Sequence, residues 1–210
     1  MGASPDAFER HIAWDIGAGA LANRLAHSLN ACVIQQTYSR LVIDCNRNPE
    51  RADAIVEVSD GTLIPANANL TSAEVSARVE MIHAPYHARI AAELNLRADK
   101  GLETVVVAIH SFTPRMNGLA RPWQVGVLHL GNSRVSQAML ASLANEAELI
   151  VGDNEPYAMA GIDYTVPLHA IGRGLDYLEL EVRQDLIGDE SGQAVWSARL
   201  AHHILGVTKA

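Results

Sequence analysis

The chain has 210 residues, 49% hydrophobic and 19% charged, which suits one packed α/β domain or at most two small ones and excludes a disordered chain. Its 16 basic and 24 acidic residues give a formal charge of −8, which argues against general nucleic-acid binding. No apolar run approaches the roughly 20 residues of a membrane span, and the first residues do not resemble a signal peptide. Its two cysteines form no CxxC pair. We therefore expect a soluble, reduced, cytoplasmic protein with no nucleic-acid or membrane partner.

Helix and strand signals alternate in the first third of the chain. Apolar residues recur at helical spacing over 15–29, and short apolar runs at 32–35 and 41–44 predict strands. The polar stretch 46–69 predicts a long loop with a turn at Asp60-Gly61. Such a long loop is usually either functional or disordered.

The middle of the chain contains a helix start and a strong strand. Thr71 to Glu74 fits a capping box, and Pro85 is expected to interrupt the helix, which resumes to about residue 98. The run TVVVAI at 104–109 is β-branched on both faces, so we expect a central, buried strand.

Strands and helices continue to alternate to the end of the chain. Strands are predicted at 125–130, 148–151 and 177–182, and helices at 137–146 and 192–205. This alternation indicates a layered α/β fold, and one domain over residues 1–210 is the simplest interpretation.

Polar residues at strand ends are the candidate site residues. His110 directly follows TVVVAI and suits a metal ligand, a general base or a hydrogen-bonded strand cap. Asn46 and Arg47 follow the strand predicted at 41–44, where the guanidinium could clamp a carboxylate or form a surface ion pair with Glu50 or Asp53. Nucleotide-binding and serine-hydrolase motifs are absent from the sequence.

Two further groups allow both structural and chemical interpretations. Glu179, Glu181 and Arg183 share one face of the last predicted strand, either as a solvated face, which is commoner, or as a polarised site. His83 and His87 have the spacing of helical metal ligands, but Pro85 lies between them and indicates a helix break.

Several motifs, read together and in order, resemble the N-formylglutamate amidohydrolase family. They are YSRLVIDCNR at 38–47, PYH at 85–87, HSFTP at 110–114, RPW at 121–123, NEPY at 154–157 and EVRQD at 181–185. The resemblance implies a three-layer α/β/α fold around a mixed sheet, like that of the zinc exopeptidases and aspartoacylases, with one zinc. It also implies hydrolysis of N-formylglutamate to formate and glutamate in amino-acid catabolism, as in histidine degradation.

The resemblance also suggests roles for individual residues. His110 would be a zinc ligand, Asp15 either a second ligand or a helix cap, and Glu181 the carboxylate that activates the metal-bound water. Asn46 and Arg47 would hold the substrate carboxylate. Three weaker candidates for orienting the small acidic N-acyl amino acid are Arg40, Arg121 and His169.

One departure from the family pattern opens alternatives. The family's N-terminal strand and its histidine motif are not found before Asp15, so either the sequence is shortened or the metal site is incomplete. The missing strand would leave a gap in the sheet or an exposed sheet edge, which a homodimer could cover. The alternatives are a non-catalytic protein that binds small acids, and a hydrolase of another acylated amino acid.

Overall fold

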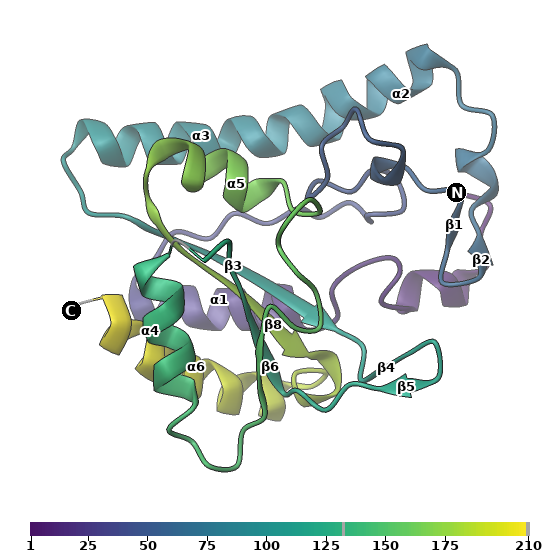
Figure 1. The fold of residues 1–210 in the computed structure, drawn as a ribbon. Helices are drawn as coiled ribbons and strands as arrows, with labels where there is room; N and C mark the ends of the chain where they lie inside the picture. Colours follow the sequence, from purple (N-terminus) through teal and green to yellow (C-terminus); the bar gives the residue numbers. More distant parts are fainter. Residues whose placement is uncertain (132, 209–210) are drawn as a thin grey trace. The chain divides into compact units, whose positions relative to one another are not determined.

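The computed structural model, drawn in Figure 1, describes residues 1–131 and 133–208. The chain divides into two compact units. Unit 1 comprises Met1–Trp14, Ile34–Thr104 and Asp163–His169. Unit 2 comprises Asp15–Val33, Val105–Ile162 and Ala170–Ala210. This division does not test the prediction of one domain over residues 1–210, which stays a prediction.

Unit 2 is built on a four-stranded mixed sheet with the order β3-β8-β6-β7. Its strands are β3 (Val105–Phe112), β6 (Val125–Leu128), β7 (Val151–Asp153) and β8 (Asp176–Arg183). β3 runs parallel to β8, β6 antiparallel to β8, and β6 parallel to β7. The expected α/β class with a mixed sheet is confirmed.

Three helices of unit 2 lie on one face of this sheet. Helices α1 (Ala18–Leu29) and α4 (Arg134–Leu143) both pack against α6 (Glu190–Thr208) and both contact the sheet. Unit 2 by itself therefore has two layers, and the three-layer, zinc-exopeptidase-like architecture stays a prediction. No helix within residues 1–131 and 133–208 is long and apolar enough to cross a membrane.

The alternation of β8 separates an apolar face from an acidic one. Leu178, Leu180 and Val182 are buried in the core that the three helices cover. Because side chains alternate along a strand, Glu179 and Glu181 lie on the opposite face of the sheet. The alternating strand expected at 177–182 is confirmed.

The expectation that TVVVAI forms a central strand is wrong. β3 lies at one end of the sheet order, and its first six residues are only partly buried. β3 also continues to Phe112, so His110 lies within the strand and not after it. A run of β-branched residues shows strand propensity, but it does not specify how many neighbours the strand has.

Unit 1 is mostly helix and irregular structure. Its helices are α2 (Ser72–Arg78), α3 (Ala84–Asp99) and α5 (Thr165–His169), and the expected turn at Asp60-Gly61 joins β1 (Val58–Ser59) to β2 (Thr62–Leu63). Short 3₁₀ turns occur at Pro5–Glu9, Ala52–Ala54 and Pro65–Asn67. Unit 2 also contains two 3₁₀ turns, at Ile171–Arg173 and Gln184–Leu186. It contains a small hairpin as well, formed by β4 (Arg115–Met116) and β5 (Leu119–Ala120).

Neither of the strands expected at 32–35 and 41–44 forms. Leu41 and Ile43 are buried, but Asn67 Nδ2 donates to the Leu41 carbonyl and Arg78 donates to the Val42 carbonyl. Side chains therefore satisfy main-chain groups that a strand would have paired with a neighbour. Residues 32–35 are mostly exposed and lie outside every helix and strand of the described chain.

Pro85 modifies the helix without ending it. The capping box of Thr71 and Glu74 is confirmed, and a π-turn (Val79–His83) joins α2 directly to α3 (Figure 1). A π-turn widens the helix just before the proline, whose ring would clash with the carbonyl four residues earlier in a regular α-helix. The predicted break is thus a local widening of one continuous helical segment.

Candidate functional site

Asp15, His110 and Glu181 form the polar cluster of unit 2. His110 on β3 lies opposite Glu181 on β8 in the parallel register. Asp15 precedes α1, and its Oδ2 accepts a hydrogen bond of 2.7 Å from His110 Nδ1. Asp15 therefore pairs with His110 through its side chain, while its main-chain carbonyl accepts from Ala18 at the start of the helix.

Gly17 fixes the chain between Asp15 and α1. It has a φ of +80°, which side-chain-bearing residues rarely adopt, and a Cβ there would lie 2.1 Å from the Ile187 carbonyl oxygen. The close contact with Ile187 holds this corner in place, which positions Asp15 for its bond to His110.

Acidic neighbours control the charge of His110. Burial alone would lower its pKa, but the hydrogen bond and charge of Asp15, with the charges of Glu181 and Glu179, raise it to about 10. His110 is therefore an imidazolium at neutral pH. Within the described residues, His110 makes its ring hydrogen bond through Nδ1, to the carboxylate of Asp15.

Glu179 and Glu181 do not form a solvated strand face. Their exposed fractions are 1% and 7%, so the commoner interpretation of these charges is wrong. Two carboxylates buried beside an imidazolium are typical of a polarised site, because charged side chains are rarely buried without a partner.

A loop crosses the sheet beside Glu181 where β6 contains glycine. Gly126 lies opposite Glu181 in the antiparallel register, and a Cβ at Gly126 would lie 1.9 Å from the carbonyl oxygen of Glu155. The same Cβ would lie 3.6 Å from Cβ of Glu181. The absence of a side chain at Gly126 therefore brings the Glu155 main chain onto the acidic face.

Arg121 makes a separate contact within unit 2. Its Nη1 donates to the Tyr157 hydroxyl at 3.0 Å, and its guanidinium carbon lies 4.8 Å from the centre of the Tyr157 ring. The guanidinium is thus stacked and hydrogen-bonded at once, which fixes its orientation.

Unit 1 holds the second group of candidates, in the turn Asp44–Arg47. Arg40 forms an ion pair with Asp44 through Nη2 and a 3.1 Å hydrogen bond through Nε. Arg47 Nε lies 3.6 Å from Asp53 Oδ2, so the ion pair considered from sequence is present.

Asn46 joins this turn to α5. Its Nδ2 donates to Asp163 Oδ1 at 2.8 Å, and its Oδ1 accepts from the main-chain N–H of Tyr164 and of Thr165 at 3.2 and 2.9 Å. The amide side chain thus satisfies N–H groups at the start of α5, as a helix cap does.

Three buried histidines surround the same turn. His83 and His87 bond through Nε2 to the carbonyls of Arg47 and Cys45, each at 2.9 Å, and His87 Nδ1 lies 2.8 Å from His169 Nε2. Burial, with His83 nearby, lowers the pKa of His87 to about 4 in spite of its bond to Cys45, so His87 is neutral. Burial also raises the pKa of the Cys45 thiol to about 11, so it is not a thiolate nucleophile.

The donor atoms do not fit the metal site that the resemblance implies. Within residues 1–131 and 133–208, no three His, Cys, Asp or Glu side chains converge in a way that could hold a metal ion. Asp15 and His110 bond to each other, whereas catalytic zinc usually has three protein ligands.

The predicted residues therefore fall into two groups. Asp15, His110 and Glu181 come together in unit 2, which also contains Arg121. The other four lie in unit 1: Arg40, Asn46, Arg47 and His169.

Sequence reasoning missed the partners of these residues. Asp163, Tyr157 and the Glu155 carbonyl showed no periodic signal, although the motif at 154–157 includes two of them. The PYH motif at 85–87 indicated His87, but not its bonds.

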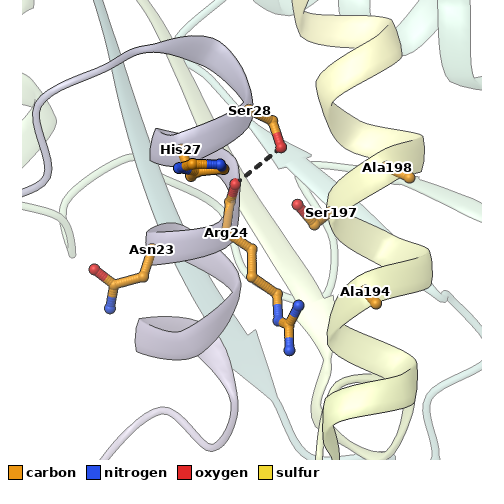
Figure 2. A pocket seen from close by; sticks show the side chains of 7 residues that line it. All are labelled: Asn23, Arg24, His27, Ser28, Ala194, Ser197 and Ala198. Atoms are coloured by element: carbon orange, nitrogen blue, oxygen red, sulfur yellow. Dashed lines mark hydrogen bonds between the residues drawn. The ribbon is translucent and has the colours of Figure 1, made fainter.

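An open groove of about 410 Å³ lies elsewhere in unit 2, between α1 and α6 (Figure 2). It is lined by Asn23, Arg24, His27, Ser28, Ala194, Ser197 and Ala198. Figure 2 shows the Arg24 side chain along the groove, with the Ser28 hydroxyl bonded to the Arg24 carbonyl. None of the predicted site residues lines this groove.

Comparisons with known proteins agree on one family. The model of the N-formylglutamate amidohydrolase family matches residues 1–188. A gene product of Agrobacterium tumefaciens of solved structure is 39% identical, with a TM-score of 0.95 over 99% of this chain and 82% of its own. The N-formylglutamate amidohydrolase of Ralstonia eutropha is 18% identical, with a TM-score of 0.63 over 91% of this chain and 80% of its own, which shows a shared fold. No curated protein matches.

Proposed function

Because the chain belongs to the N-formylglutamate amidohydrolase family and is an amide hydrolase, we propose that its substrate is an N-acyl amino acid. N-Formylglutamate is the first candidate, with formate and glutamate as products. The observation that carries the proposal is the Asp15–His110–Glu181 cluster, in which a buried carboxylate lies beside an imidazolium.

Glu181 is proposed as the general base. Its carboxylate would accept a proton from the attacking water and later deliver it to the leaving amine. Glu181 is buried and lies opposite His110 in the parallel register, so its carboxylate is placed beside the imidazolium.

His110 is proposed as the electrostatic partner of the reaction. Asp15 orients the ring through Nδ1, so the N–H at Nε2 can point toward negative charge that develops on the formyl oxygen. A hydrogen bond from an imidazolium is stronger than one from a neutral donor, and it strengthens as the oxygen becomes an oxyanion.

Arg47 is proposed to bind the substrate carboxylate. Its guanidinium matches carboxylate geometry, and Asp53 at 3.6 Å is distant enough to be exchanged for a closer anion. Arg40, which pairs with Asp44, and Arg121, which bonds to Tyr157, are proposed as orienting residues. The amide of Asn46 is engaged with Asp163 and α5, so we assign it to shaping the turn.

Zinc remains a prediction from the resemblance. The described donor set lacks a group of three ligands, so the steps above are assigned to side chains alone. Metal analysis of tag-free protein, with formate release measured before and after chelation, decides whether an ion is required. The cytoplasm is the proposed location, and both cysteines are free thiols, as expected there.

Formate release from N-formylglutamate tests the proposal. Glu181→Gln should lower kcat by about 10²- to 10⁴-fold with little change in substrate binding. Glu148→Gln, the same change at an exposed position of unit 2, serves as the matched control. Wild-type turnover by Glu181→Gln would remove Glu181 from the mechanism. Binding of N-formylglutamate without turnover by the wild type would favour the non-catalytic alternative.

A further inference from the structure

The turn that presents Arg47 is held at each of its three residues. The Cys45 and Arg47 carbonyls accept hydrogen bonds from His87 and His83, and the Asn46 side chain caps α5. Few main-chain groups of a surface turn are usually tied to buried side chains, because loops tend to hydrogen-bond to water. This turn is therefore held far more firmly than its irregular structure suggests.

The positions of the protons follow from the acceptors. A carbonyl oxygen only accepts, so Nε2 of His87 must carry a hydrogen toward Cys45. Because His87 is neutral, its Nδ1 has a lone pair and accepts from Nε2–H of His169. The bonds therefore run in one direction, from His169 through His87 to the turn.

The three rings are buried and packed against one another. Their exposed fractions are 3% for His83, 8% for His87 and 3% for His169. The ring centres of His83 and His87 are 4.4 Å apart, and the rings of His87 and His169, which are within 16° of parallel, have centres 5.1 Å apart. Packing of this kind leaves each ring few orientations, so the hydrogen bonds hold the turn against a rigid support.

We infer that His83, His87 and His169 are positioning residues, which fix the main chain of Cys45–Arg47 so that Arg47 meets the substrate carboxylate in one orientation. This inference rests on the proposed function for its substrate, and on the geometry of unit 1 for the network. Pre-organised binding groups raise affinity because less conformational entropy is lost when the ligand binds.

Two variants of His87 distinguish the contribution of its hydrogen bonds from that of ring packing. His87→Phe keeps a ring and removes both bonds, whereas the amide of His87→Gln can still donate to the Cys45 carbonyl. We expect His87→Phe to raise KM for N-formylglutamate by about 10-fold, the effect of losing one or two hydrogen bonds. Its kcat should stay within about threefold of wild type. His87→Gln should recover part of this loss. His202→Phe, the same change at an exposed position of α6, is the control.

Amide hydrogen exchange tests the network without a substrate. His87→Phe should speed the exchange of the Asn46 and Arg47 amides, which bond to Asp44, by about 10-fold or more. Unchanged exchange there would overturn the positioning role, whatever the activity. Faster exchange with an unchanged KM would overturn the link to Arg47. A wild-type chain that releases no formate would overturn the proposed function instead, and the exchange result would still decide whether the histidines hold the turn.

Discussion

Asp15 Oδ2 and His110 Nδ1 lie 2.7 Å apart across 95 positions of sequence, and this bond links the start of α1 to the edge strand β3. Both side chains are about one quarter exposed, so the pair is accessible from solvent while Glu181 beside it is buried. A carboxylate that holds an imidazolium in this way sets both the orientation and the charge of the ring.

Asp15→Asn should lower kcat for formate release by roughly 10- to 100-fold, the value of a hydrogen bond to a charged group. The amide keeps the shape of the side chain but loses the charge that favours the imidazolium. Asp153→Asn is a matched control, because Asp153 pairs with His129 at 2.8 Å in the same unit. An equal decrease of kcat in Asp15→Asn and Asp153→Asn would contradict a special role for Asp15.

Arg47→Lys should raise KM for N-formylglutamate by roughly 10- to 100-fold and change kcat much less. A lysine keeps the charge but loses the planar fork that binds a carboxylate through two hydrogen bonds. Steady-state kinetics of formate release measure both constants.

Arg51→Lys provides the comparison for Arg47, since Arg51 also pairs with Asp53, at 2.7 Å, and is exposed. We expect its KM to stay within about twofold of wild type, because exposed ion pairs contribute little. If Arg51→Lys raised KM as much as Arg47→Lys, Asp53 and not the substrate would explain the effect.

The local elements of this chain were accessible from the sequence. The alternation of β8 and the capping box at Thr71 depend on neighbouring residues, and both predictions hold. The edge position of β3 depends on which strands lie beside it, information that its own β-branched residues do not carry.

The site was predictable as a set of residues but not as a set of contacts. Motif resemblance selected Asn46 and His110, yet their partners Asp163 and Asp15 are 117 and 95 positions away. Periodicity reaches only a few residues along the chain, so the assignment of Asn46 to the cap of α5 required the three-dimensional structure.

Gly126→Ala should destabilise the protein by about 1–3 kcal/mol, the usual cost of overpacking. The new Cβ would lie 1.9 Å from the Glu155 carbonyl oxygen, which must move off the acidic face. Since Glu181 lies on that face, kcat should fall as well. The urea midpoint and the rate of formate release measure the two effects.

Gly206→Ala is the control for this substitution. Gly206 is inside α6, and apart from its chain neighbours and the nearby backbone of that helix, no heavy atom of the described residues lies within 4 Å of a Cβ there. We expect it to stabilise the protein by about 0.5–1 kcal/mol through helix propensity. A loss of stability at Gly206 equal to that at Gly126 would mean that the Glu155 contact is not the cause.

His87 should make the free energy of unfolding depend on pH in weakly acidic solution. Its pKa is about 4 in the folded protein and about 6.5 in an unfolded chain, so between these values the unfolded state binds the extra proton. The contribution of His87 is therefore fully present above pH 6.5 and is lost as the pH falls toward 4.

Urea unfolding at pH 7, 6 and 5 tests this linkage. His87→Phe should be less stable than wild type at pH 7, because two buried hydrogen bonds are lost. The difference should shrink toward pH 5, since the variant lacks the group that takes up the proton on unfolding. A difference that stays constant or grows as the pH falls would mean that His87 is protonated in the folded protein, and the direction assigned to the His169–His87–Cys45 bonds would then be wrong.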